Sequence, residues 1–586
     1  MPLMGSLYVG ASGLQTSQNA LNTTAHNLSN IDTVGYTRQQ VQQSAKQYVT
    51  LSVNPEAVNN KQTGLGVTYS RVKQIRDYFL DKTYRKESGR SMFYEVSTEV
   101  MEHVESQLGE MNGEAFQTTI TDFWTAIQEL AKDPASSVTQ GLLVQRASEF
   151  VERATAVYDG LSSYQNNLNI QIGKQVGQIN DYGKQIVELN DRIRAIEAGG
   201  IEHANDLRDA RNYILDELAK MTSISYTEDI FGSVSVQIEG VDFVKGDSVY
   251  EIALQADPNT GFYTPFWPLN ATYKELGDGV REYNIDGAEV FNLNREISTD
   301  LNTDIGGLKA MLLARGDHRA DYTDIDGDYD SISQSIVMNI QAEFDQLIHS
   351  VVTKVNGILA DAAGVQKGDI TLDDGTVLQG VRFAGESSSG YMRADDGSPL
   401  QMFSKIATEG YRKVTGTVTY TDSEGNPQTA TGEFWVYNEE DPKLQDSLYS
   451  VKNLQINQDL MQRPAILGFR LPDGSEDIAT AEALKAAFTE EAYTLNPNVK
   501  KKTTFVDYYS DLVSQVANSG SVYRSIYQNQ ESTVESVYSA REQVIGVSSD
   551  EELSNMIKFQ NAYNASSRYI NVISEMLEHI INTLGH

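Results

Sequence analysis

The chain has no cysteine among its 586 residues, and only 12 of them are proline. Without cysteine, the sequence excludes a disulfide framework, a thiolate zinc site and a cysteine nucleophile. Proline lies well below the ~5% of an average protein, while glycine, at 44 residues, is ordinary. Because proline interrupts helices, its scarcity favours long ones. The sequence also lacks any run of 18 apolar residues, so no transmembrane helix is expected.

Positive charge is scarce as well. Lysine and arginine number 46 against 81 aspartates and glutamates, which gives a net charge of −35. A chain this acidic repels phosphate backbones and anionic membrane surfaces, so we expect neither nucleic acid nor a membrane as a partner. The N-terminus has no basic segment followed by an apolar one, so a cleaved signal peptide is not expected. Taken alone, that absence suggests a cytosolic protein.

The N-terminal segment carries a heptad pattern of leucines. They are Leu7, Leu14, Leu21 and Leu28, with Ala11, Gln18 and Ala25 at the positions between them. This spacing predicts a helix with a coiled-coil seam. Coiled coils in water normally carry glutamate and lysine beside the seam, but residues 1–31 contain none. An uncharged helix of this kind suits packing against several neighbours at once.

The C-terminal segment carries a second heptad seam. Ser549 and Glu552 have the spacing of a capping box, which predicts a helix start. The seam that follows consists of Met556, Phe559, Tyr563, Ser566, Ile570, Ile573, Leu577, Ile580 and Leu584. Two interpretations remain open at this point. Each terminal helix could pack on its own domain, or the two could pair with each other and with other subunits.

A more specific motif follows the first helix. It reads Asn27-Leu28-Ser29-Asn30-Ile31-Asp32-Thr33-Val34-Gly35-Tyr36-Thr37-Arg38-Gln39. Asn30 and Asp32 are typical of a helix end and a turn, and Gly35 permits a positive φ. We therefore expect the helix to stop here and an extended, glutamine-rich segment to leave it.

This motif resembles the Asn-x-x-Asn-x-x-Thr-x-Gly-Tyr signature of bacterial flagellar axial proteins, which include the rod, hook and hook-associated proteins. Its matching residues are Asn27, Asn30, Thr33, Gly35 and Tyr36, and the continuation through Arg38 and Gln39 is similar to the hook-associated protein 1 family. Val34 stands where the family usually has proline. Residues 546–563 resemble the family's closing motif, and residues 205–211 also resemble the hook-associated members.

The resemblance implies a structural role without catalysis or cofactor. It implies a homo-oligomeric ring that joins hook to filament, with the hook protein below and a second junction protein above. It further implies a flagellar export chaperone for the C-terminal helix, and type III export to an extracellular position without a cleaved signal. The two terminal helices pair in this family. The expected subunit-interface residues are Leu7, Leu14, Leu21, Leu28, Met556, Phe559, Tyr563, Ile570, Ile573, Leu577 and Ile580.

The middle of the chain predicts an α+β multidomain fold. Residues 75–225 have helical periodicity, and one helix is expected over about 140–198. Alternating strand patterns occupy about 226–300. Residues 366–500 look β-rich, with one hairpin turn at Asp374-Gly375 and another around residues 424–427. We therefore expect a terminal coiled-coil domain (1–60 plus 546–586), a rod-like long-helix bundle (61–365 plus 501–545) and a β-rich surface insertion (366–500).

The sequence offers little that could support catalysis or metal binding. The seven histidines are scattered, and no zinc-protease, P-loop or nucleophile-elbow motif occurs. The acidic segment Asp324–Asp330 could suit calcium, but Tyr322 and Ser333 occupy the template positions that need carboxylates. Arg315-Gly316-Asp317 forms an integrin-type tripeptide that chance explains. We expect no enzyme, no cofactor and no metal site.

Three alternatives remain beside the junction protein. One is another flagellar axial protein, a hook or rod subunit, although the long helix over 140–198 argues against it. A second is a coiled-coil surface adhesin that binds host or matrix through the β insertion, which would need a signal peptide and an anchor. A third is a secreted hydrolase, for which residues 366–500 supply no nucleophile or metal motif.

Overall fold

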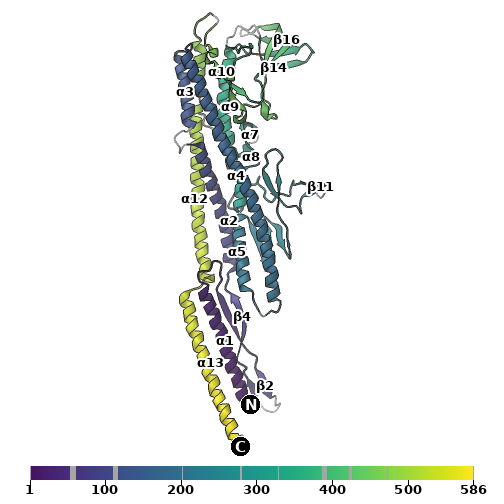
Figure 1. The fold of residues 1–586 in the computed structure, drawn as a ribbon, viewed down its shortest axis with the longest axis vertical. Helices are drawn as coiled ribbons and strands as arrows, with labels where there is room; N and C mark the ends of the chain where they lie inside the picture. The colour runs from purple at the N-terminus through teal and green to yellow at the C-terminus, as the bar shows by residue number, and fades with distance from the viewer. Residues whose placement is uncertain are drawn as a thin grey trace.

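The first and last helices of the chain lie side by side at one end of an elongated molecule (Figure 1). They are α1 (Pro2–Ser29) and α13 (Ser549–Leu584), referred to below as the terminal pair. A helical bundle continues from this pair, and a β-containing insertion lies at the far end (Figure 1). The computed structural model describes residues 2–52, 61–109, 116–200, 202–277, 280–327, 329–385, 392–421, 425–471 and 473–584. The α+β multidomain class predicted from the sequence is confirmed.

The bundle is built around one exceptionally long helix. This helix, α4, runs unbroken from Ser137 to Glu197, so its 61 residues span roughly 90 Å at ~1.5 Å per residue. Its neighbours come from both halves of the chain. They are α2 (Tyr78–Leu108), α3 (Phe116–Lys132), α5 (Asn205–Met221), α6 (Gly307–Arg315), α9 (Ile336–Ala362) and α12 (Phe505–Ile545). The helix expected over 140–198 is confirmed.

A small β layer packs against the lower half of α4. Its main sheet is antiparallel, with the order β5 (Ile224–Glu228), β6 (Val234–Ile238), β7 (Val241–Lys245) and β8 (Ser248–Val249). Two hairpins extend it: β9 (Ala253–Ala256) with β10 (Tyr263–Phe266), and β11 (Thr272–Gly277) with β12 (Val280–Asn284). Gly183 of α4 gives the sheet room, since a Cβ there would stand 2.6 Å from Cζ of Phe243. This close approach accounts for a glycine inside a straight helix.

Aromatic side chains join the bundle to the insertion at the far end. Phe123 of α3 stacks on Phe150 of α4, with ring centroids 5.5 Å apart. Both rings also meet Phe403, which belongs to the insertion. Offset and edge-on aromatic contacts of this kind stabilise a core beyond simple burial. The insertion therefore shares a core with the bundle.

The insertion contains a closed four-stranded barrel. Its strands follow the order β13 (Gln366–Leu372), β14 (Val377–Gly385), β17 (Pro427–Tyr437) and β16 (Tyr411–Thr421). Two short strands, β15 (Phe403–Lys405) and β18 (Leu454–Ile456), pair beside it. Gly375 adopts a φ of +83° in the turn between β13 and β14. Both predicted hairpins are confirmed.

Within the insertion predicted to be β-rich, residues 366–500, the strands end at Ile456 and helices follow. After β18 come α10 (Gln458–Gln462) and α11 (Ile478–Thr489), together with three short 3-10 helices, η1 (Gln445–Ser447), η2 (Val451–Asn453) and η3 (Pro464–Leu467). Asp477 caps α11 by accepting the N–H of Thr480 at 3.1 Å. The alanine-rich sequence of α11 favours a helix. Phe488 then stacks on Trp124 of α3, so α11 forms part of the bundle wall.

Two sequence features with possible binding roles are structural. The acidic segment 324–330 lies in two short helices, α7 (Tyr322–Gly327) and α8 (Tyr329–Ile332), with Asp328 outside the described residues. Asp324 pairs with His318 at 3.2 Å. Arg315 is buried and donates to Oδ1 of Asn169, so the Arg315-Gly316-Asp317 tripeptide is not displayed for recognition. Across the described part of the chain, no group of histidines and carboxylates is suited to a metal, and no helix is long and apolar enough to cross a membrane.

Two carboxylates of α9 lie fully inside the bundle. Asp345 accepts the backbone N–H of Tyr322 at 3.1 Å and of Val451 at 2.7 Å. Glu343 accepts from the side-chain amides of Asn496, at 2.6 Å, and Gln515. Burial raises the pKa of each group to about 7, and the hydrogen bonds offset only part of this effect. These groups hold α9 against four separate segments.

We predict that the free energy of unfolding decreases as pH rises from about 5 to 7. Unfolded carboxyls titrate near ~4, so in this range the folded state binds more protons than the unfolded state. Each group contributes up to about 1.4 kcal/mol per pH unit. Chemical unfolding at pH 5, 6, 7 and 8 measures the slope. Glu343→Gln should reduce it and the exposed Glu482→Gln should not, whereas a stability that rises across this range would contradict the assignment.

Candidate assembly site at the chain termini

The two terminal helices approach each other closely at two glycines of α1. A Cβ added to Gly10 would stand 2.7 Å from Cγ1 of Ile570, and one added to Gly13 would stand 2.9 Å from Oγ of Ser566. Real side-chain carbons essentially never approach so closely, so a side chain at either position would force Ile570 or Ser566 to move. The terminal pair therefore packs through small residues on α1 and larger ones on α13.

The two predicted seams differ in how far the structure buries their side chains. On α13 the seam side chains Met556, Phe559, Tyr563, Ile570 and Leu577 are half-buried, Ile573 is buried, and Ile580 is 38% exposed. On α1 the seam leucines Leu7, Leu14, Leu21 and Leu28 are only half-buried, and Ala11, Gln18 and Ala25 are exposed. The residues of α1 that are buried instead are Gly10, Thr16, Ser17, Ala20, Thr24 and Asn27. The leucine seam is thus not the centre of the contact within this chain.

A β-ribbon lies beside α1. Strands β1 (Gln39–Ala45) and β4 (Val67–Gln74) pair antiparallel, and β2 (Val49–Ser52) pairs with β3 (Lys61–Thr63) farther along. The N–H of Val67 donates to Oγ of Ser12 at 3.2 Å, which fixes β4 against the helix. As a result, α1 lies between α13 and this ribbon, and it contacts both of them.

Asn27 of the motif ties the end of α1 to the start of β1. Its Nδ2 donates to the carbonyl of Gln39 at 2.9 Å, and its Oδ1 accepts the N–H of Gln39 at 3.0 Å. The same Oδ1 accepts from the hydroxyl of Tyr36 at 2.8 Å. Asn27 is 1% exposed. Its amide therefore satisfies both backbone groups of Gln39 where water is excluded.

The other motif residues form the turn between α1 and β1. Asn30 donates to the carbonyl of His26 at 2.9 Å and accepts from the hydroxyl of Thr33 at 3.2 Å. Gly35 adopts a φ of +80°, which favours glycine, and lies against Tyr213 of α5. Val34 is 84% exposed, so a valine in place of the family's usual proline removes no buried contact.

Arg38 connects this turn to the junction between α12 and α13. Its Nε donates to Oε1 of Glu552 at 2.8 Å, its Nη2 pairs with Glu551 at 2.8 Å, and its backbone N–H donates to the carbonyl of Ile545. The capping box expected at Ser549 is therefore wrong by one residue. Ser548 is the residue that accepts from Glu551 N–H, and the carboxylate of Glu552 binds Arg38.

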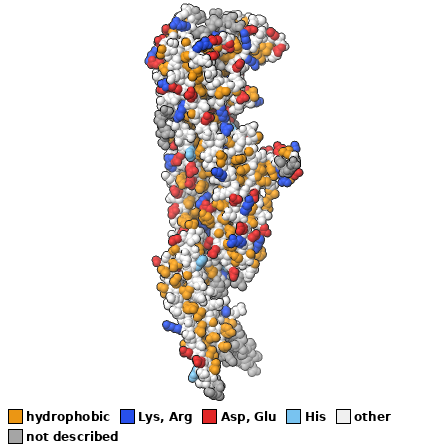
Figure 2. Space-filling view, in the orientation of Figure 1, with side chains coloured by type: hydrophobic (Ala, Val, Ile, Leu, Met, Phe, Trp, Pro, Cys, Tyr) orange, Lys and Arg blue, Asp and Glu red, His pale blue; other side chains and the backbone are white. Residues whose placement is uncertain are grey.

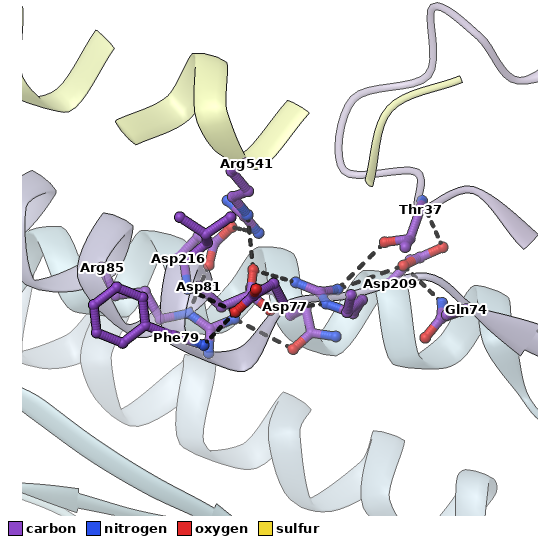
Figure 3. Close-up of polar contacts among 12 residues, drawn as sticks. Thr37, Gln74, Asp77, Phe79, Asp81, Arg85, Asp209, Asp216 and Arg541 are labelled. Atoms are coloured by element: carbon purple, nitrogen blue, oxygen red, sulfur yellow. Dashed lines mark hydrogen bonds and ion pairs between the residues drawn. The ribbon is translucent and has the colours of Figure 1, made fainter. Parts of the chain in front are cut away.

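Buried ion pairs continue from this junction into the bundle (Figure 3). Arg76 binds both carboxylate oxygens of Asp81 at 2.9 Å, and Arg541 of α12 binds Oδ1 of the same carboxylate at 2.8 Å. Arg541 also pairs with Asp216 of α5 at 2.8 Å, and Arg85 binds Asp216 at 2.6 Å. Burial alone would raise the pKa of Asp81, but the three arginines hold it below its usual value. We call this the junction network.

Asp209 of α5 completes the junction network on the side of the motif (Figure 3). Its Oδ2 accepts the N–H of Thr37 at 3.1 Å, and its Oδ1 accepts from the side chain of Gln74 at 2.8 Å. Burial raises the pKa of Asp209 to about 6, and the contacts with Thr37 and Arg76 offset part of that rise. Loop, ribbon and bundle therefore meet at one carboxylate.

We predict that Asn27→Ala loosens the link between α1 and β1. The substitution leaves the N–H and carbonyl of Gln39 and the hydroxyl of Tyr36 unpaired, at about 1–3 kcal/mol for each buried group. Hydrogen–deuterium exchange of the Gln39 amide on the full chain measures the effect, with Asn22→Ala, exposed on the same helix, as the control. Unchanged protection at Gln39 would show that Asn27 does not hold the turn.

Family models match three regions of the chain. Residues 101–371 match the flagellar hook-associated protein FlgK helical domain. Residues 7–37 match a flagella basal body rod protein, and residues 544–583 match the C-terminal region of flagellar basal body rod FlgEFG proteins. The two shorter matches coincide with α1 and its motif, and with α13.

Curated relatives extend the similarity over nearly the whole length. Flagellar hook-associated protein 1 of Bacillus subtilis is 25% identical over 98% of this chain and 96% of its own. The protein of the same name from Escherichia coli K12 is 24% identical over 99% and 100%. The solved hook junction protein FlgK of Burkholderia pseudomallei has 14% identity and a TM-score of 0.48, covering 80% of this chain and 100% of that one. Over nearly its whole length the chain is therefore similar to flagellar hook-associated protein 1, and this similarity supports a structural role in the bacterial flagellum.

Proposed function

We propose that this protein is the structural subunit that joins hook to filament, and that its copies assemble into a ring through the terminal pair. The observation that carries this proposal is an apolar surface that the terminal pair leaves uncovered. On α13 this surface consists of Leu553, Ile557, Tyr569, Val572, Met576 and Ile581, each at least 42% exposed. Exposed apolar side chains clustered along a helix mark contacts with other proteins.

The N-terminal helix also has exposed apolar side chains. Met4 and Tyr8 of α1 are exposed, and the leucine seam at its flank is only half-buried. Figure 2 shows hydrophobic side chains over the terminal pair, with few charged ones among them. The predicted interface residues Leu7, Leu14, Leu21 and Leu28 are thus still available to neighbouring copies. Ile573, which the chain itself buries, stabilises the pair from within.

Burial of this surface between copies provides the driving force. Full burial of a large apolar side chain contributes roughly 1.5–3 kcal/mol. Several such side chains per copy, summed around a ring, give a stable assembly without covalent chemistry. The absence of charge from residues 1–31 removes the desolvation cost that charged flanks would add.

The family resemblance supports the remaining partners and the location. Within the proposal, the hook protein lies below the ring and a second junction protein lies above it. A flagellar export chaperone covers α13 before export through the type III channel, and the mature protein is extracellular. The protein is a structural component, not an enzyme. A hook or rod subunit and a surface adhesin are the alternatives that the experiment below must exclude.

The domain division is proposed with one change from the sequence expectation. The terminal domain comprises 1–60 plus 546–586, and the bundle comprises 61–365 plus 501–545. The insertion begins at about 366, but its β part ends with β18 at Ile456, and α11 packs against α3. The projecting part of the insertion is therefore the barrel.

We predict that Val572→Asp with Met576→Asp abolishes filament growth while the purified chain keeps its fold. Both side chains are exposed in the single chain but would become buried charges between copies. The assay is complementation of cells that lack the protein, which should form hooks without filaments and shed flagellin. The matched control, Asn564→Asp with Asn571→Asp, adds the same charge on the polar face of α13. Normal filaments with the first variant would refute assembly through this surface.

A further inference from the structure

A small cavity beside β4 is lined by cations and by no carboxylate. Its volume is about 250 Å³, and its lining residues are Arg71, Lys73, Gln74, Arg76, His203, Asn205 and Arg208. It lies next to the junction network, which contributes Gln74 and Arg76 (Figure 3). We call it the cationic pocket. Its composition is unusual for a chain with a net charge of −35.

Two of these cations have no carboxylate partner. Arg76 and Arg208 are already neutralised, by Asp81 and by Glu197. Arg71 and Lys73, in contrast, each face a glutamine across the β-ribbon, Gln42 and Gln40. Arg71 donates to Oε1 of its glutamine at 3.0 Å. In the described part of the chain no ion pair joins either residue to a carboxylate, so the pocket keeps unpaired positive charge at its rim.

A cluster of negative charge lies elsewhere on the same molecule. Glu95 and Glu99 of α2 lie near Glu531 of the adjacent α12, and Glu535 follows one turn later. We call these four residues the acidic ridge. Burial, and then the charges of Glu99 and Glu531, raise the pKa of Glu95, and the nearby charge of Lys220 offsets part of that rise. Among the described residues none of the four forms an ion pair, so a cation from outside the chain would relieve their repulsion.

The two surfaces cannot meet within one copy. The cationic pocket lies at the start of α2, beside Arg76, whereas Glu95 and Glu99 lie roughly 30 Å farther along that helix at ~1.5 Å per residue. A neighbouring copy shifted along the rod by about that distance brings the pocket and the ridge together.

We propose that the cationic pocket of one copy binds the acidic ridge of the next copy. This proposal rests on the proposed function, because it requires copies that stand side by side. A contact between two different surfaces is heterologous, so it repeats from copy to copy, and with a shift along the axis the ring that it builds is helical rather than flat. Opposite charges at such a contact set the register of neighbours more than their affinity. The apolar terminal pair would then hold the copies together, and the charged contact would fix their stagger.

The absence of cysteine makes a direct test possible. We expect Lys73→Cys combined with Glu99→Cys in the full chain to form disulfides between copies when assembled flagella are oxidised, giving dimers and a ladder of larger products. Each cysteine alone should give no ladder. Lys73→Cys combined with Glu482→Cys is the matched control, since Glu482 is an exposed glutamate of α11. Assembled flagella in which the first pair forms no product, or in which Lys73→Cys alone joins another flagellar protein, would overturn the proposal.

A charge exchange provides the second test. Arg71→Glu with Lys73→Glu should place like charges at the contact, as should Glu99→Lys with Glu531→Lys. Either change should increase shed flagellin about tenfold. The chain with all four substitutions should return to near the unsubstituted level, and failure to do so would refute the pairing. The failure of this proposal can be told apart from failure of the proposed function. If Val572→Asp with Met576→Asp abolishes filaments but the Lys73→Cys and Glu99→Cys pair forms no cross-link, the charged contact is rejected and the proposed function stands.

Discussion

The close approach of α1 to α13 is the constraint on which the rest of the structure depends. The two helices come from opposite ends of the chain, and they meet where Gly10 and Gly13 leave no room for a side chain. Their pairing brings the Asn27 turn next to the start of α13, where Arg38 can reach Glu551 and Glu552. Because the two ends of the chain are paired, the residues between them must start and finish at the same end of the molecule. The chain meets this requirement by running away from the terminal pair in α2 and back toward it in α12, and these two helices are in contact.

The periodic features were predictable from the sequence because they depend on local spacing. The unbroken α4, both barrel hairpins and the seam of α13 all follow from period and turn residues. The contact face of α1 did not follow, because a leucine heptad gives a stronger signal than the small residues at Gly10, Ser17 and Ala20. The glycine spacing could have indicated it. The junction network could not be predicted, since Asp81 and Arg541 are 460 positions apart and no local pattern links them.

Charge is distributed in a way that the total of −35 conceals. Residues 1–31 carry none, and the carboxylates at the junction are buried and matched by arginines. A buried ion pair adds little net stability compared with apolar packing, but loss of one partner is strongly destabilising. Such pairs therefore favour one arrangement over others. At Asp81, two arginines from different parts of the chain bind one carboxylate, and a small shift of α12 against α2 would break the contact with Arg541.

The junction network explains how the terminal pair is held rigidly on the bundle. Between α12 and α13 the helix stops at Ile545 and restarts at Ser549, and between α1 and the bundle only the turn and the ribbon connect. Covalent links alone would leave the terminal pair free to swing. Arg38 binds the end of α12 through Ile545, and Asp209 of α5 binds Thr37 and Gln74. Arg76, which follows the ribbon, binds Asp81 of α2. These separate contacts restrict the orientation of the terminal pair. Force applied to the terminal pair is then carried into α2, α5 and α12 together, which suits a subunit between two mechanically different structures.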